Sequence, residues 1–174
     1  YIIGHNIGFD MGAAGNPQGY RTIDTLVLSQ KAWPEATSHT QTALFYRLYS
    51  ENGLDLSNAR SFVQHAHSAS VDIQICSFIL DQLIQKLQPE MDYIEVFVGE
   101  DLSLFDRLHL LSQIVQIPMK MEFGKHIGIP PHKVPRDYKD WYMRTESPNP
   151  LLLLSMNQGG NTPEGKALYE LSKY

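Results

Sequence analysis

Three side chains with useful chemistry stand where the local structure could direct them into one site. Asp10 ends the segment Gly4-His5-Asn6-Ile7-Gly8-Phe9-Asp10, in which an apolar strand is expected to pass into a helix. Asp72 lies about one turn into another expected helix, and His67 stands at the entrance of that helix. Carboxylates are the ligands that Mg²⁺ and Mn²⁺ prefer, and histidine exchanges a proton near neutral pH. Together these residue types could bind a hard cation and move a proton.

Each of these residues also has an ordinary structural role. A carboxylate in the first turn of a helix, as expected for Asp10 and Asp72, stabilises the helix N-terminus. His67 could be a solvated capping residue, and Asn6 an ordinary turn former. His65 and His67 form a pair of the kind that zinc binds, but no cysteine or further histidine stands at a useful spacing. The chemical interpretation therefore depends on the combination, and zinc is not expected.

Short strands and helices are expected to position these residues. Apolar and β-branched runs predict strands over residues 1–3 and 21–25. Helical spacing predicts helices over 11–14, 26–33, 40–51 and 68–87, with a connector at 54–56. In the second half of the chain we expect strands over 93–98 and 119–123, and helices over 102–115, 135–144, around 151–154 and from Thr162 onward.

Composition narrows the class of protein. The 174 residues are 43% hydrophobic and 19% charged, as in ordinary globular proteins. No apolar stretch approaches the ~20 residues that a membrane span needs, so no membrane contact is expected. The single cysteine, Cys76, excludes an intramolecular disulfide and, with no signal peptide at the start, favours a cytoplasmic location. A net charge of −5 gives no general attraction for nucleic acid, so any such contact must be local or carried by metal ions.

The order of the motifs resembles that of a known family. A strand followed by H-N-x-x-F-D, then a strand ending in Asp24-Thr25, then H-x-A-x-x-D entering a long helix is similar to the second and third motifs of the DEDDh 3′→5′ exonucleases. These belong to the ribonuclease H-like superfamily, which includes polymerase proofreading subunits. The resemblance covers about residues 1–88. It implies an α/β fold with a ribonuclease H-like mixed sheet and flanking helices.

A second resemblance lies in the C-terminal part. Segments 123–128 and 134–141 look like the C-terminal module of exodeoxyribonuclease X-type enzymes. This implies an exonuclease domain over 1–90, a connector over 91–118 and a small α+β module over 119–174. Cations outnumber carboxylates here and could contact phosphates or form a solvated face: Lys120, Lys125, Lys133, Arg136, Lys139 and Arg144 against Glu122, Asp137 and Asp140. The aromatic residues Tyr138, Trp141 and Tyr142 could instead fill a small core.

The resemblance implies roles for the candidate residues. Asp10 and Asp72 would bind Mg²⁺ or Mn²⁺, with two ions in the intact parent protein. His67 would be the general base that takes a proton from the attacking water. Phe9 would pack under its helix and fix the direction of Asp10. The contacts to the terminal nucleotide would come from His5, Asn6 and Phe9.

One departure from the family pattern has large consequences. The first motif of the family, Asp-x-Glu on an opening strand, is not among the 174 residues. We therefore expect a fragment that lacks its N-terminal strands, has an exposed sheet edge and is itself inactive. Its parent would release 5′-mononucleotides from the free 3′ end of DNA. The alternatives are an exoribonuclease of the same superfamily and a non-catalytic nucleic-acid-binding module, and the oligomeric state is left open.

Overall fold

The computed structural model of the chain describes residues 1–64, 68–98 and 101–173. Its fold divides into two compact units. The first unit consists of Tyr1–Tyr93 and Leu102–Ser112, and the second of Ile94–Asp101 and Gln113–Tyr174. The division into an exonuclease domain, a connector and a C-terminal module, with boundaries at residues 90 and 118, stays a prediction. The fold is rich in helix and contains a small parallel sheet, which is compatible with the expected α/β class.

The first unit is built around two parallel strands. Strand β1 (Ile2–Gly4) pairs with β2 (Thr22–Asp24), so that Ile2 stands opposite Thr22. Parallel pairing requires a long crossover between the strands, which α1 (Ile7–Ala13) and the loop after it provide. Helix α2 (Thr25–Ala32) follows β2 directly. Both strands and α2 lie close to their predicted positions, whereas α1, predicted over 11–14, begins four residues earlier at Ile7.

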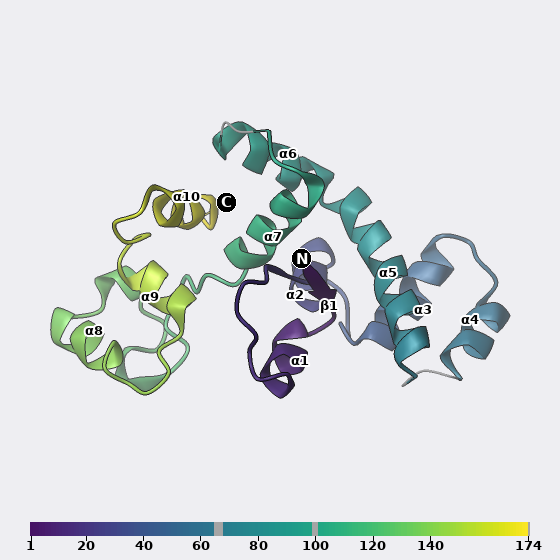
Figure 1. Ribbon diagram of the computed structural model, residues 1–174, viewed down its shortest axis with the longest axis horizontal. Helices are drawn as coiled ribbons and strands as arrows, with labels where there is room; N and C mark the ends of the chain where they lie inside the picture. Colours follow the sequence, from purple (N-terminus) through teal and green to yellow (C-terminus); the bar gives the residue numbers. More distant parts are fainter. Residues whose placement is uncertain (65–67, 99–100, 174) are drawn as a thin grey trace. The chain divides into compact units, whose positions relative to one another are not determined.

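A layer of helices completes this unit. Helix α5 (Ala69–Lys86) packs against α2 and against α3 (Gln41–Glu51), and α3 also contacts α4 (Leu56–Val63). Figure 1 shows α5 running beside α3. The buried side chains of α5 recur at every fourth residue and confirm the predicted stripe: Ile75, Ile79 and Leu83. Residues 54 and 55 connect α3 to α4, as predicted, but Leu56 already belongs to α4, a helix that the sequence did not predict. Asp55 caps this helix by accepting the Ser57 N–H.

A buried carboxylate joins the strands to the helices. Asp24 is 8% exposed, and its Oδ1 accepts the N–H of Leu26 at 2.9 Å and the N–H of Asn6 at 3.0 Å. The first hydrogen bond caps α2, and the second holds the turn that leaves β1. The Asp24 N–H donates to Ser112 Oγ at 3.3 Å, which ties helix α7 (Leu104–Ile114) to β2.

Residues 93–98, predicted as a strand, belong instead to helix α6 (Gln88–Val98). Leu87, Met91 and Ile94 are buried at spacings of four and three residues, which is the period of a helix. Val96 is 81% exposed, so its β-branched side chain fills no sheet. The helical stripe therefore outweighs the aromatic and β-branched composition that suggested a strand.

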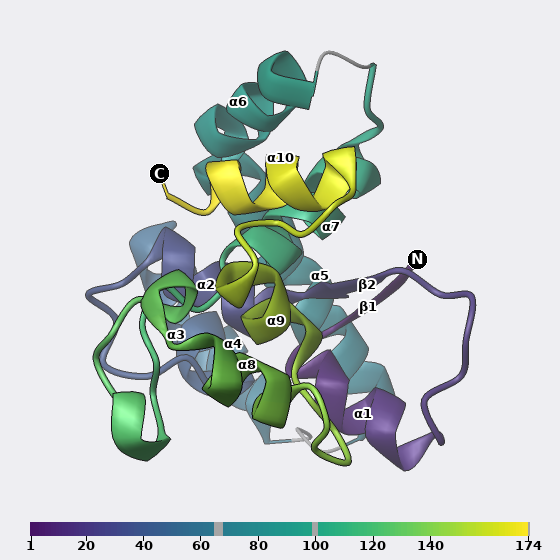
Figure 2. The ribbon, with the colours of Figure 1, turned by 90° about the vertical axis from the view of Figure 1, so that its left-hand side faces the viewer.

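The second unit is helical in the part of the chain that the structure describes. It contains the 3₁₀ turns η1 (Gly124–His126) and η2 (Pro131–Lys133) and the helices α8 (Arg136–Tyr142), α9 (Pro150–Met156) and α10 (Pro163–Leu171). Figure 2 shows α9 between α8 and α10. Its buried core consists of Met121, Val134, Tyr138, Tyr142, Leu152 and Met156. Within the described residues, no helix has the length and apolar character needed to cross a membrane.

The β component predicted for the C-terminal module is wrong in the described part of the chain. Residues 119–123, where a strand is expected, form no ladder. The Met121 N–H donates to the Ile129 carbonyl at 2.9 Å, and the Gly128 N–H donates to the Met121 carbonyl at 2.7 Å. Both bonds involve Met121 and close the loop between residues 121 and 129. A strand would require a ladder of such bonds that continues along the chain.

We expect Asp24→Ala to lower the free energy of unfolding by about 2 kcal/mol, because it removes a helix cap and leaves two amide groups without their acceptor. Asp24→Asn keeps one carbonyl oxygen and should lose less. Urea denaturation followed by circular dichroism measures both. Asp55→Ala is the matched control, because it removes an exposed cap of α4 only, and an equal loss in this control would contradict the role given to Asp24.

Candidate active site

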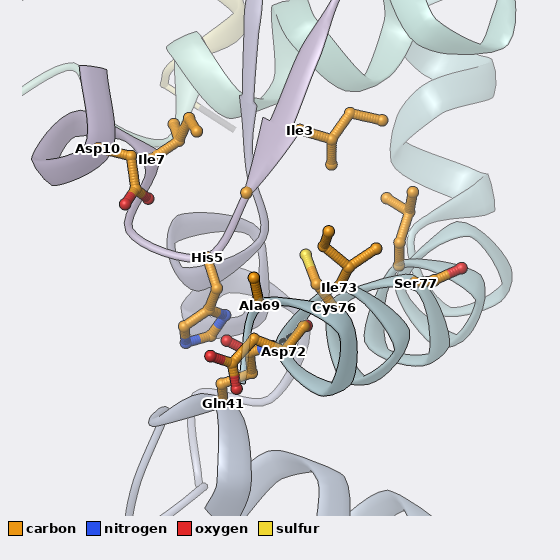
Figure 3. Close-up of a pocket in the computed structure, with 12 residues that line it drawn as sticks. Ile3, His5, Ile7, Asp10, Gln41, Ala69, Asp72, Ile73, Cys76 and Ser77 are labelled. Atoms are coloured by element: carbon orange, nitrogen blue, oxygen red, sulfur yellow. Dashed lines mark hydrogen bonds between the residues drawn. The ribbon is translucent and has the colours of Figure 1, made fainter. Parts of the chain in front are cut away.

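A pocket of about 650 Å³ lies in the first unit at the end of β1. It is lined by residues of β1 and α1, by the start of α3 and by residues 69–80 of α5 (Figure 3). The turn from β1 into α1 forms one wall. A Cβ on Gly4 would stand 2.6 Å from Ile7 Cδ1, so this turn is too tight for a larger residue without movement. The volume of the pocket falls in the range of sites that bind small molecules.

Asp10 and Asp72 both line this pocket, although they are far apart in the sequence. Asp10 lies in the first turn of α1 and is exposed, and Asp72 lies in the first turn of α5 and is half-buried. Figure 3 shows them reaching the pocket from different elements, with the His5 side chain between them in this view. The two carboxylates that the sequence singled out therefore line one pocket.

His5 lines the same pocket but is held by the protein. Its Nε2 donates to the His39 carbonyl at 2.7 Å, and its Nδ1 lies 3.0 Å from Thr25 Oγ1. With the proton on Nε2, Nδ1 is the acceptor of the neutral ring, and the Thr25 hydroxyl beside it is shared with the Gly4 carbonyl at 3.2 Å. Burial lowers the pKa of His5, and the His39 carbonyl and the nearby Asp24 offset part of this effect. Both nitrogens are occupied, so a ligand would meet the carbon edge of the ring.

Asn6 and Phe9 have different surroundings from those of His5. Asn6 has a left-handed backbone with φ 65°, and its N–H donates a hydrogen bond to the Asp24 carboxylate. This fits the turn-forming role. Phe9 is 74% exposed, so the expectation that it packs under α1 and directs Asp10 is wrong. The reason is helical geometry: Ile7 is the buried residue of α1, and a residue two positions later points away from it. Nucleotide contact by these side chains stays a prediction.

His67 lies outside the described residues, as does His65, so the general base assigned by the resemblance is not located. The structure adds pocket residues that the sequence did not indicate. Gln41, at the start of α3, lines the pocket, and its Nε2 donates to the Asp72 carbonyl. Cys76 follows Asp72 by one helical turn, a spacing that could have predicted its place in the pocket. Burial raises the pKa of its thiol, so Cys76 is a poor nucleophile at neutral pH.

The carboxylates of the pocket do not by themselves fit the expected pair of metal ions. In the described part of the chain, no three His, Cys, Asp or Glu side chains gather closely enough to hold a metal. A Mg²⁺ ion needs near-octahedral oxygen ligands and is commonly held by one or two carboxylates with water and substrate phosphates. Asp10 and Asp72 could supply part of such a set, and two ions would need further carboxylates.

The half-buried His5 predicts a loss of stability in mild acid. Its pKa in the folded protein is below 6.5, the ordinary value, so the unfolded chain binds the extra proton more readily. The contribution of His5 is fully present above pH 6.5 and is lost as the pH falls through the folded pKa. We expect the melting temperature to fall between pH 7.5 and 5, and to fall less in His5→Gln. His132→Gln, in the second unit, is the control, and an unchanged pH dependence in His5→Gln would refute the assignment.

Comparisons of the chain with protein-family models, with curated proteins and with solved structures gave no match.

Proposed function

We propose that this chain is part of a metal-dependent 3′→5′ exonuclease that hydrolyses DNA from a free 3′ end. The observation that supports this most is the meeting of Asp10 and Asp72 in one pocket. The two residues come from separate motifs whose order and spacing resemble those of the DEDDh exonucleases. A ribonuclease H-like sheet, of which β1 and β2 would be a part, belongs to the same proposal.

The pocket offers suitable surroundings for a terminal nucleotide. Ile3, Ile73 and Leu80 give it an apolar lining against which a base or sugar could pack. Asp10 and Asp72 add negative charge, which would repel a phosphodiester unless cations neutralised both. Mg²⁺ or Mn²⁺ bound there would supply that neutralisation and lower the pKa of a bound water. His67, one residue before the cap of α5, is the proposed base for that water.

A binding module without catalysis is the second candidate. It is favoured by the small number of acidic ligands, because Asp10 and Asp72 are the carboxylates of the pocket in the described part of the chain. The two functions differ in one respect that can be measured. A catalytic site loses activity when a carboxylate is removed, and a binding module has no hydrolysis to lose.

The first test uses the protein with any sequence that precedes Tyr1 in its parent, a 5′-labelled single-stranded DNA and Mg²⁺. We expect stepwise shortening from the 3′ end and a loss of at least about 100-fold in rate for Asp10→Ala and Asp72→Ala. Asp81→Ala is the matched control, because Asp81 is an exposed carboxylate on the same helix as Asp72. Binding of DNA without any hydrolysis would favour the binding module, and a matched RNA would identify an exoribonuclease.

The 174-residue chain alone gives a second test. We expect it to show no processive digestion, because two carboxylates hold a pair of divalent ions too weakly. Calorimetric titration with Mn²⁺ should show weak binding that Asp72→Ala reduces further. Efficient digestion by this chain would contradict the need for additional acidic ligands.

A further inference from the structure

The second unit carries a group of exposed aromatic and cationic side chains that its own core does not use. We call it the Trp141 surface. It consists of Phe123, Lys125, Trp141 and Arg144, over the buried rings of Tyr138 and Tyr142. The surface lies on α8, on the turn that follows it and on the loop that contains η1.

The rings of this surface form a connected series. Trp141 lies 5.0 Å from Tyr138 and 6.5 Å from Tyr142, measured between ring centroids. Phe123 lies 5.9 Å from Tyr142. Tyr138 and Tyr142 are each 8% exposed, whereas Phe123 is 43% and Trp141 is 55% exposed. The tyrosines are thus core residues that support two exposed rings.

The exposure of Trp141 needs a reason beyond packing. A large aromatic side chain contributes to stability by leaving water, and the indole keeps much of its surface in water. The sequence allowed the aromatic residues of α8 to be a small core, and this holds for Tyr138 and Tyr142 only. An indole that packs against buried rings and keeps more than half of its surface exposed is suited to stacking with a flat ligand.

Positive charge lies beside these rings. Lys125 Nζ lies 5.6 Å from the centroid of Tyr138, and Arg144, an exposed cation, stands three residues after Trp141 in the turn that follows α8. Residues 119–144 hold six cations and three carboxylates in a chain whose net charge is −5. Two of these carboxylates, Asp137 and Asp140, are on α8, and Asp140 lies 3.9 Å from Arg136. The excess of positive charge remains after they are counted.

A glycine holds the loop against α8. Gly124 has a φ of +70°, and a Cβ there would stand 2.7 Å from the Tyr138 hydroxyl. A larger residue would be strained and would push the loop away from the ring. The close approach places the next residue, Lys125, over Tyr138.

We propose that the Trp141 surface binds single-stranded nucleic acid. Bases would stack on Trp141 and Phe123, and the phosphates between them would lie against Lys125 and Arg144. Single strands are favoured over a duplex because stacking on a side chain requires a base that is free of its neighbours. The choice of nucleic acid rests in part on the proposed exonuclease function, and the surface would give the substrate a second place to bind.

The binding test uses the 174-residue chain in EDTA, so that no metal site contributes. The probes are fluorescein-labelled oligo(dT) and oligo(U), followed by anisotropy. Intrinsic fluorescence adds a direct signal, because the chain has two tryptophans and Trp33 is 6% exposed. We expect the strand to quench Trp141, and Trp141→Ala to weaken binding at least about tenfold while Trp141→Phe retains most of it. Tyr20→Ala, an exposed aromatic of the first unit, should bind as the unchanged chain does.

The role of the cations is tested by salt. Lys125→Gln and Arg144→Gln should each weaken binding and reduce the slope of log K against log salt by about 0.7, because each change leaves one phosphate of the single strand without its cation. Lys31→Gln, an exposed cation of the first unit, should leave the slope unchanged.

Several results would overturn the inference. They are no binding at low salt, binding unaffected by Trp141→Ala, or equal competition by a duplex. Asp81→Ala, which lies outside the pocket and outside the Trp141 surface, should bind normally in EDTA. Normal binding with no exonuclease activity in the longer protein would remove the proposed function and leave this surface in place. Exonuclease activity that is lost in Asp72→Ala, together with no DNA binding by the 174-residue chain, would support the proposed function and remove the Trp141 surface as a binding site.

Discussion

The pocket depends on the hydrogen bonds of one buried carboxylate. Asp24 Oδ1 accepts two backbone N–H groups, one from Leu26 at the start of α2 and one from Asn6 in the turn after β1. A buried carboxylate is tolerated only when such donors replace the water it loses. These two hydrogen bonds therefore hold the end of β1 against the start of α2, the helix that follows β2. The wall that contains Gly4 and His5 follows from that constraint.

The same turn explains why the two candidate carboxylates differ in their surroundings. His5 is fixed by Thr25 and by the His39 carbonyl, so its side of the pocket is rigid. Asp10 lies beyond it on a helix of seven residues and is exposed, which leaves its carboxylate free to adjust to a ligand. Asp72 stands on α5, whose apolar stripe anchors it in the core. A ligand in the pocket would thus meet one carboxylate on a helix packed in the core and one on a short helix at the surface.

Most elements could be predicted from the sequence because their buried residues keep one period. The stripe of α5 is an example. Residues 93–98 could not, because Tyr93, Val96 and Phe97 suggest a strand by type, while burial at Met91 and Ile94 follows a helix. In the site, helix N-termini predicted the places of Asp10 and Asp72. The hydrogen bond from His5 to the His39 carbonyl and the exposure of Phe9 depend on contacts far along the chain, which local patterns do not contain.

Charge is distributed in a way that bears on both proposals. The pocket presents Asp10 and Asp72, so its own field opposes a phosphodiester unless cations are bound. A net charge of −5 offers no compensation over the chain as a whole. Affinity for a nucleic acid must then come from a local region, and residues 119–144 are the segment where cations exceed carboxylates and aromatic rings are exposed. An acidic pocket for chemistry and a separate basic, aromatic surface for holding the strand would resolve this conflict, because each can be optimised without weakening the other.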